Sequence, residues 1–165
     1  MKKYYDILTT DCGDIAIIAN NEGIIEVAFQ QGKVAVEITK DYQLADEHAP
    51  VHLAQAKQQL TEYFSGSRQS FDLPLSQHGT IFQNNVWQAL TKIPFGKTIN
   101  YGQLASNINN PKAVRAVGTA NGANKIAIIV PCHRVIGRDK KLTGYAGGMG
   151  IKAKLLMLEG AHFKV

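Results

Sequence analysis

The sequence predicts an α+β fold in two parts, a small N-terminal α/β sheet domain over residues 1–78 and a mainly α-helical domain with a helix-turn-helix over residues 79–165. Three observations lead to this prediction. β-rich segments fill the first third of the chain, helical periodicity prevails in the second half, and the two parts differ in charge. The first part holds 6 Lys and Arg against 11 Asp and Glu, and the second holds 12 against 2.

The N-terminal part begins with three predicted strands. They span Tyr4–Thr9, Asp14–Ala19 and Ile24–Phe29, and they are rich in β-branched and aromatic residues. The turn-like sequence Asn20–Gly23 separates the second strand from the third. Strands this close in sequence can pair with one another as a meander.

A helix and an extended segment complete the N-terminal part. Pro50 lies near the start of a helical pattern, and Gly66 is suited to end it. Phe71–Leu75 returns to extended chain, where Pro74 marks a sheet edge or an exit from the sheet. The apolar residues of the helical pattern share one face: Leu53, Ala56, Leu60, Tyr63 and Phe64.

The second part opens with a capped helix. Thr80, with Gln83 three residues later, forms a capping box at its start. The break Pro94–Gly96 ends the helical run. Between the cap and the break, the apolar residues of one face are Val86, Trp87 and Leu90.

Two further short helices make a candidate helix-turn-helix. The first is predicted at Tyr101–Ile108, and the pair Asn109-Asn110 forms a turn after it. Pro111 is suited to open the second helix, because the N–H that proline lacks has no partner in a first turn. This helix is predicted to run to about Asn121. Two such helices in a basic domain are typical of DNA-binding proteins, although helical hairpins also occur in many others.

The charge distribution indicates an anionic partner for the second part. Its net charge is +10, against −5 for the first part, and nucleic acid is the commonest polyanion that such a field attracts. No apolar run is long enough to cross a bilayer, and Met1–Asp6 is not typical of a signal peptide. We therefore expect a cytoplasmic protein without membrane contact, whose Cys12 and Cys132 are free thiols.

A cysteine with chemically active neighbours follows the apolar run Ile126–Val130. We expect this run to be a buried, extended segment that delivers Cys132 at its end, after Pro131. A lone buried cysteine is usually just a small apolar residue. His133 and Arg134 follow directly, however, and packing does not require either of them. Positive charge or a proton-accepting imidazole promotes ionisation of a thiol, so Cys132 is a candidate nucleophile.

A carboxylate is needed to orient His133 if the pair acts as part of a catalytic triad. Only two acids, Asp139 and Glu159, occur after residue 78. Asp139 lies in the lysine-flanked turn Gly137–Lys141 and is expected to be solvated. Glu159 ends the helical segment Leu155–Glu159 and is the better candidate.

The segment Pro131–Val135 resembles the active-site signature of the O6-alkylguanine-DNA alkyltransferases, also called methylated-DNA–protein-cysteine methyltransferases. The resemblance is strong from Thr80 to Gly160, whereas the first part shares only a strand-helix pattern. It implies a ribonuclease H-like sheet domain followed by a winged-helix or helix-turn-helix DNA-binding domain. Four more segments resemble the family in order and at similar spacing: Tyr101–Ala105, Asn110–Gly118, Gly144–Gly148 and Leu158–Gly160.

The resemblance also implies an activity, which is direct reversal of DNA damage. A methyl or larger alkyl group would pass irreversibly from O6-alkylguanine, and by extension O4-alkylthymine, to Cys132 after nucleotide flipping. His133 would relay the thiol proton through a water, Glu159 would orient His133, and Asn124 would tie together the turns beneath the site. The protein would need no cofactor, act once per molecule, and bind double-stranded DNA as a monomer.

The resemblance assigns further residues to the DNA and the flipped base. Arg115 would fill the gap in the base stack, and Tyr101 would help rotate the 3′ phosphate and donate a hydrogen bond toward the guanine. Tyr145 would line the alkyl pocket, and backbone groups at Cys132, Val135 and Ala146 would read the guanine edge. The rest of the implied DNA-binding set is Ala116, Gly118, Thr119 and Arg134.

Two positions depart from some relatives, and no metal is predicted. Ala146 stands where some relatives have serine, which removes a hydroxyl from the pocket, and Lys125 stands where some have proline. The N-terminal part contains Cys12 and scattered histidines, which do not form a four-ligand zinc set: His48, His52 and His78.

Three other functions remain open at the level of sequence. A non-catalytic sensor of alkylated DNA would look similar, but such relatives lack the cysteine. A cysteine hydrolase could use a Cys-His-Glu triad, although neighbouring side chains of an extended segment point in opposite directions. A helix-turn-helix regulator would leave Cys132, His133 and Glu159 unexplained.

Overall fold

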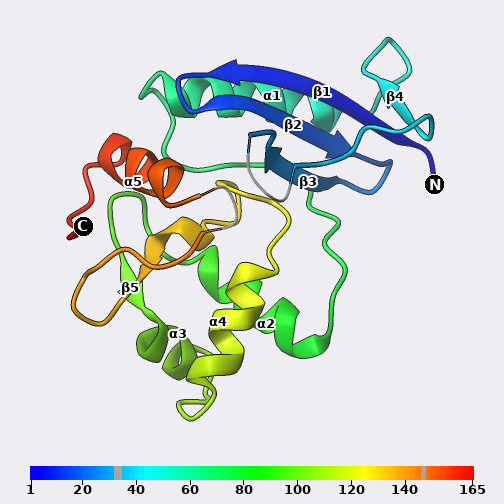
Figure 1. The fold of residues 1–165 in the computed structure, drawn as a ribbon. Coiled ribbons are helices and arrows are strands. Elements are labelled where there is room, and N and C mark those ends of the chain that lie inside the picture. Colours follow the sequence, from blue (N-terminus) through cyan, green and yellow to red (C-terminus); the bar gives the residue numbers. More distant parts are fainter. Residues whose placement is uncertain (32–34, 146–147) are drawn as a thin grey trace. The chain divides into compact units, whose positions relative to one another are not determined.

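The computed structural model describes residues 1–31, 35–145 and 148–165 of the chain (Figure 1). The chain divides into two compact units, Met1–Gln77 and His78–Val165. The first unit contains a sheet and a helix, and the second is mainly helical with a small two-stranded sheet. The α+β class predicted from the sequence is therefore confirmed.

The described part of the first unit forms a four-stranded sheet with the order β3-β2-β1-β4. β1 (Lys3–Thr10) pairs antiparallel with β2 (Gly13–Ala19), and β2 pairs antiparallel with β3 (Ile24–Phe29), which confirms the predicted meander. Gly13 has a φ of +99° in the tight turn between β1 and β2, a conformation that favours glycine. β4 (Tyr42–Leu44) runs parallel to β1 and was not predicted, because three residues are too few to show a periodic pattern.

One helix, α1 (Val51–Phe64), packs against β1 and β2. Pro50 is its N-cap, and Gly66 follows its C-terminus with a φ of +84°, so both predicted boundary signals are confirmed. Of the segment Phe71–Leu75, only Leu75 forms a bridge to the sheet, opposite Ile24. The apolar face predicted for α1 is buried at Leu53, Ala56, Leu60 and Tyr63, whereas Phe64 is half-buried.

The second unit is built on three helices that pack on one another: α2 (Ile81–Leu90), α3 (Tyr101–Asn107) and α4 (Val114–Gly122). The predicted capping box of α2 is confirmed, because Thr80 Oγ1 accepts from the Gln83 N–H at 3.0 Å and the Gln83 side chain accepts from the Thr80 N–H. α2 is tied to α4 by Trp87, whose indole N–H donates to the Ala120 carbonyl at 2.9 Å.

The start of α4 differs from the prediction. Pro111 does not open the helix but lies in a turn that continues to Ala113, whose N–H donates to the Asn110 carbonyl at 3.0 Å. Proline at this point therefore belongs to the connection between α3 and α4, and the helix begins at Val114. A turn and a first helical turn place similar demands on proline φ, so the sequence signal alone does not separate them.

Short elements bring together those segments of the second unit that carry the candidate site residues. β5 (Ile99–Asn100) leads directly into α3 and pairs parallel with β6 (Val135–Ile136). η1 (Cys132–Arg134) is a single 3-10 turn that precedes β6, and α5 (Met149–Leu158) packs against it. The first turn of α3, the cysteine segment and the end of α5 consequently lie close to one another.

Candidate active site

The apolar run Ile126–Val130 turns back on itself, which corrects the predicted extended segment. Ile128 has a φ of +70°, and the Val130 N–H donates to the Ile126 carbonyl at 3.1 Å. Asn124 holds the turn, because its amide donates to the carbonyls of Ile126 at 3.3 Å and Val130 at 2.8 Å. The prediction of burial was right at four of the five positions, but an apolar pattern carries no information about a positive φ.

Cys132 begins the 3-10 turn and is only 5% exposed. Its N–H donates to the Val130 carbonyl at 2.8 Å, and its own carbonyl accepts from the Asn121 amide at 3.4 Å. Burial raises the pKa of the thiol, while a hydrogen bond from Asn124 and the charge of Lys152 oppose that shift. The resting cysteine is therefore a protonated thiol that needs a base before it can attack.

His133 and Glu159 form a buried pair without exposed side-chain surface, and His133 Nε2 lies 2.7 Å from Glu159 Oε2. An ionised carboxylate cannot donate, so the imidazole donates through Nε2–H. Burial lowers the pKa of His133, although the hydrogen bond to Glu159 works against it. In the neutral ring Nδ1 then carries no hydrogen, and this buried atom has no hydrogen-bond partner within the described part of the chain. Nδ1 is thus a proton acceptor.

Arg134 is buried beside the same carboxylate. Its Nε donates to Glu159 Oε1 at 2.8 Å and its Nη2 to Oε2 at 3.0 Å, while Nη1 donates to the Ile93 carbonyl at 2.6 Å. Burial would raise the pKa of Glu159, but the hydrogen bonds from His133 and Arg134 outweigh it and lower the pKa to about 2. Arg134, which the resemblance placed among the DNA-binding residues, thus has its guanidinium engaged inside the unit.

We refer to Cys132, His133, Arg134 and Glu159 together as the reaction centre. Two polar residues that the sequence analysis missed lie beside it. Lys152 is fully buried, and its Nζ donates to the Val135 carbonyl at 2.7 Å and to Thr143 Oγ1 at 3.1 Å. Thr143 Oγ1 in turn lies 2.6 Å from the hydroxyl oxygen of Tyr101. Burial lowers the pKa of Lys152 to about 8, and the charge that Cys132 carries when its thiol ionises works against this shift.

A helical pattern could have pointed to Lys152. The spacing i, i+3, i+4 and i+7 puts four residues on one face of the last helical segment, and the structure buries all four: Lys152, Leu155, Leu156 and Glu159. A lysine on the buried face of a helix indicates a specific partner, because an ammonium group is rarely buried unless it is paired. Thr143 carries no comparable signal.

The predicted DNA-binding residues of α4 lie mostly on its surface. Arg115, Ala116 and Thr119 are exposed, and Gly118 is half-buried. A Cβ atom at Gly118 would lie 3.7 Å from the Tyr101 ring, so α4 passes close to that tyrosine. The remaining positions differ in burial, since Val135 is fully buried and Tyr145 is half-buried. Ala146 lies outside the described residues.

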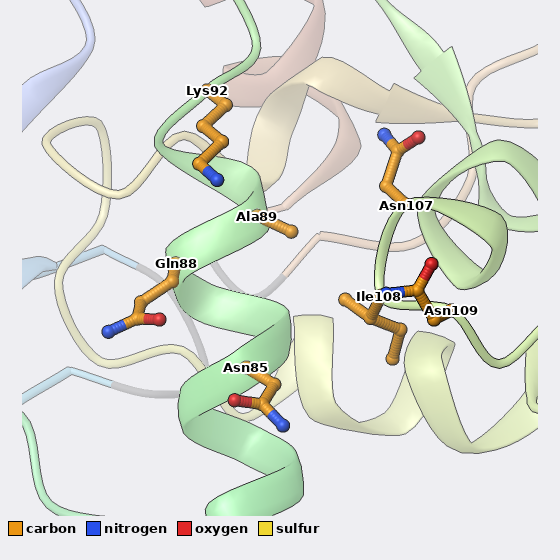
Figure 2. A pocket seen from close by; sticks show the side chains of 7 residues that line it. All are labelled: Asn85, Gln88, Ala89, Lys92, Asn107, Ile108 and Asn109. Carbon is orange, nitrogen blue, oxygen red and sulfur yellow. The ribbon is translucent and has the colours of Figure 1, made fainter.

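A polar groove of about 440 Å³ lies apart from the reaction centre, between α2 and the end of α3 (Figure 2). The lining is polar except for Ala89 and Ile108, it includes Lys92, and it contains no acidic residue. None of the predicted site residues lines it either. Its lining is Asn85, Gln88, Ala89, Lys92, Asn107, Ile108 and Asn109.

Neither a metal cluster nor a membrane span is found among the described residues. No group of three or more His, Cys, Asp and Glu side chains in that part of the chain is arranged to hold a metal ion. In the same part, no helix is both long and apolar enough to cross a membrane.

Comparison with known proteins gives matches along the chain. The model of the 6-O-methylguanine DNA methyltransferase ribonuclease-like domain matches residues 3–77, and the model of the DNA-binding domain of the same family matches residues 81–161. A methylated-DNA–protein-cysteine methyltransferase from Methanosarcina acetivorans is 49% identical over 158 residues, which cover 96% of this chain and 99% of the relative. A constitutive enzyme of the same name from Bacillus subtilis is 48% identical over 98% of both chains.

Solved structures agree with these matches. The crystal structure of the Mycobacterium tuberculosis O6-methylguanine methyltransferase is 40% identical and aligns with a TM-score of 0.84, covering 96% of this chain and 93% of the other. A structure from the same organism in complex with DNA is 39% identical and also has a TM-score of 0.84, covering 95% of this chain and 92% of that one. With both domain models matched in order, this chain belongs to the 6-O-methylguanine DNA methyltransferase family.

Proposed function

We propose that this chain repairs O6-alkylguanine in double-stranded DNA by moving the alkyl group to Cys132 in one irreversible, stoichiometric reaction. The observation that carries the proposal is the buried thiol next in sequence to His133, whose imidazole is hydrogen-bonded to the Glu159 carboxylate at 2.7 Å. A relative with a TM-score of 0.84 has been solved with DNA, which supports DNA as the partner. In this proposal the protein acts in the cytoplasm as a monomer and without a cofactor.

Activation of the thiol is the first step. The Cys132 proton passes through one water to His133 Nδ1, and the Glu159 carboxylate stabilises the imidazolium that forms. The sulfur lone pair then forms the bond to the alkyl carbon, and the bond from that carbon to O6 breaks with its electron pair left on the guanine. The products are a thioether at Cys132 and a guanine anion, which becomes unmodified guanine when it takes up one proton; this proton balances the one that Cys132 gave to His133. Each chain therefore acts once.

Departure of the guanine requires stabilisation of the charge that develops on the base. Tyr101 donates a hydrogen bond toward the base in this proposal. The carbonyl of Val135 accepts from Lys152 at 2.7 Å and retains a second lone pair for an amino group of the guanine. Tyr145 and the backbone at Cys132 and Ala146 complete the base pocket, as the family resemblance implies.

Extrusion of the damaged nucleotide precedes the chemistry, because the alkyl carbon is inaccessible within a duplex. Unstacking costs about a few kcal/mol, and an inserted side chain offsets part of that cost. Arg115 is exposed on α4 and is suited to enter the gap. The small residues of the same helix allow it to approach the groove closely without reading base edges: Ala116, Gly118 and Thr119.

The polar groups beneath the site keep the reacting atoms in place in this scheme. Asn124 bonds to the turn before the nucleophile through Ile126 and Val130, so it positions Cys132. Arg134 anchors the Glu159 carboxylate with two hydrogen bonds. We assign both residues to the support of the reaction centre rather than to contact with DNA.

Intact mass of the protein after incubation with an O6-methylguanine duplex tests the proposal. We expect the mass to increase by one methyl group, to saturate at one per chain, and to map to the peptide that contains Cys132. A Cys12→Ser variant is the matched control and should react like the wild type. Tight binding of the damaged duplex without a mass change would point to a damage sensor instead, and repeated turnover to a hydrolase. A duplex with O4-methylthymine tests the wider substrate range in the same way.

A further inference from the structure

Three polar side chains form a continuous line of hydrogen bonds beside the reaction centre. Lys152 Nζ lies 3.1 Å from Thr143 Oγ1, which lies 2.6 Å from the Tyr101 hydroxyl oxygen. The three residues come from α5, from the loop before it and from the first turn of α3. The line thus joins the buried lysine to the residue assigned to the departing base.

The direction of these hydrogen bonds follows from the hydrogens available. A lysine ammonium has three hydrogens and cannot accept, and the three acceptors of Lys152 are the Val135 carbonyl, the Thr143 carbonyl and Thr143 Oγ1. Thr143 Oγ1 thus receives a hydrogen from Lys152 and keeps its own for another acceptor. The Tyr101 oxygen lies within reach of it. When Thr143 donates to that oxygen, the hydroxyl hydrogen of Tyr101 points away from Thr143.

The charge of Lys152 strengthens the hydrogen bonds of this line. Burial disfavours an ammonium unless its hydrogens are bonded, and two of the three bonds go to the single residue Thr143. With its pKa lowered to about 8 by burial, Lys152 is mainly protonated at neutral pH. A hydroxyl that accepts from a charged donor becomes a better donor itself, because hydrogen bonds in a chain polarise one another.

We propose that Thr143 and Lys152 are positioning residues for the leaving-group step, which hold the Tyr101 hydroxyl as a hydrogen-bond donor toward the departing guanine. The inference rests on the proposed function, in which Tyr101 donates to the base. As the bond to O6 breaks, negative charge builds on the guanine and the Tyr101 hydrogen bond to it shortens. Thr143 and the ammonium stabilise the charge that this places on the Tyr101 oxygen. Each hydrogen stays on its own heavy atom while the hydrogen bonds of the line shorten, so no bond to hydrogen breaks and no other reactant is needed.

Thr143→Val tests the inference because it keeps the shape of the side chain and removes the hydroxyl. We expect single-turnover transfer from an O6-methylguanine duplex, with protein in excess, to be about tenfold slower, which corresponds to the loss of one hydrogen bond. Thr143→Ser keeps the hydroxyl and should restore the rate. Thr91→Val is the matched control, since Thr91 is exposed at the end of α2 and its hydroxyl bonds only within that helix, to Gln88.

Alkylation of Cys132 by iodoacetamide distinguishes the proposed role of Thr143 in the departure of the base from a merely structural role. Iodide leaves without a proton donor, so wild type and Thr143→Val should react at equal rates, measured by peptide mapping because Cys12 also reacts. Equal slowing of both reactions would mean that Thr143 only shapes the surroundings of Cys132, and would overturn the inference. A Thr143→Val rate on the duplex equal to or above the wild-type rate would also overturn it.

Failure of the inference can be separated from failure of the proposed function. If the wild type transfers no methyl group, the proposed function is wrong. If the wild type transfers and Thr143→Val matches it, only the inference is wrong. Lys152→Met extends the test and should slow transfer at least as much as Thr143→Val, provided that its circular dichroism spectrum is unchanged.

Discussion

The reaction centre and the surface of α4 are organised in opposite ways. Around Cys132, the side chains of His133 and Arg134 are buried, and each is hydrogen-bonded to the buried Glu159 carboxylate. On α4, Arg115 is exposed and forms no ion pair within the described part of the chain. Folding alone therefore builds the arrangement around Cys132, whereas the exposed side chains of α4 are expected to gain partners only on DNA in the proposed function. Substitutions in the first region should change both stability and chemistry, and those in the second should change only the reaction on DNA.

Cys132→Ala should have the largest effect on chemistry, with complete loss of methyl transfer. Alanine offers no nucleophile, while the exposed face of α4 is unchanged, so we expect the variant to bind an O6-methylguanine duplex as the wild type does. Intact mass measures the first quantity and fluorescence anisotropy of a labelled duplex the second. Loss of DNA binding together with transfer would show that the two regions are not separable.

Glu159→Gln should damage both rate and stability, as expected for the buried region. We expect transfer to slow about a hundredfold, because His133 loses the carboxylate that stabilises its imidazolium. Unfolding in urea should show a loss of about 3 kcal/mol, since Arg134 remains buried without its ionic partner.

Asp139→Asn is the matched control for Glu159→Gln. The Asp139 side chain is 61% exposed and lies 4.0 Å from Lys141 Nζ. Its loss should change the free energy of unfolding by about 0.5 kcal/mol or less, as for other exposed ion pairs. If Glu159→Gln were as mild as this control, the buried carboxylate would not hold the reaction centre together.

Acid should weaken the contribution of Glu159 to stability. Its pKa is about 2 in the folded protein against an ordinary value of 4.5, so the ionised form stabilises the fold above the higher value. That contribution, about 3 kcal/mol, is lost as pH falls through the folded-state pKa. The difference in unfolding free energy between wild type and Glu159→Gln should therefore shrink between pH 4.5 and 2. A constant difference over this range would contradict the assignment.

Arg115→Ala should have the smallest effect, restricted to the reaction on DNA. We expect duplex repair to slow about tenfold, equivalent to roughly 1.4 kcal/mol, because nothing fills the gap in the base stack. The free energy of unfolding should change by about 0.5 kcal/mol or less, as for other surface substitutions. Lys154→Ala removes one exposed positive charge from α5 and serves as the control for charge alone. If Arg115→Ala and Lys154→Ala slowed duplex repair equally, Arg115 would contribute only through its charge.

The sequence predicted those features that depend on local signals. The strands of the meander follow from β-rich segments, and α2 follows from the capping box of Thr80 and Gln83. The pairing of His133 with Glu159 could be predicted because the second half of the chain has only two acidic residues. In each case, one or two neighbouring residues or a short list of candidates carried the information.

Features that depend on three-dimensional geometry could not be predicted in the same way. The turn at Ile128 has a positive φ, which a β-branched residue adopts only when its surroundings require it, and the Asn124 amide supplies part of that requirement. The line from Lys152 through Thr143 to Tyr101 joins segments up to 51 residues apart. Contacts of this kind are set by tertiary packing and leave no periodic pattern in the sequence.

Reaction with free O6-methylguanine base tests the central claim most directly, because the base reaches Cys132 without duplex DNA. We predict that wild type and Arg115→Ala are methylated by the free base at the same rate, measured by intact mass, while Arg115→Ala is slower on the duplex. That result would show that the reaction centre is complete without α4 engaging DNA. Equal slowing of Arg115→Ala on the free base and on the duplex would contradict the claim.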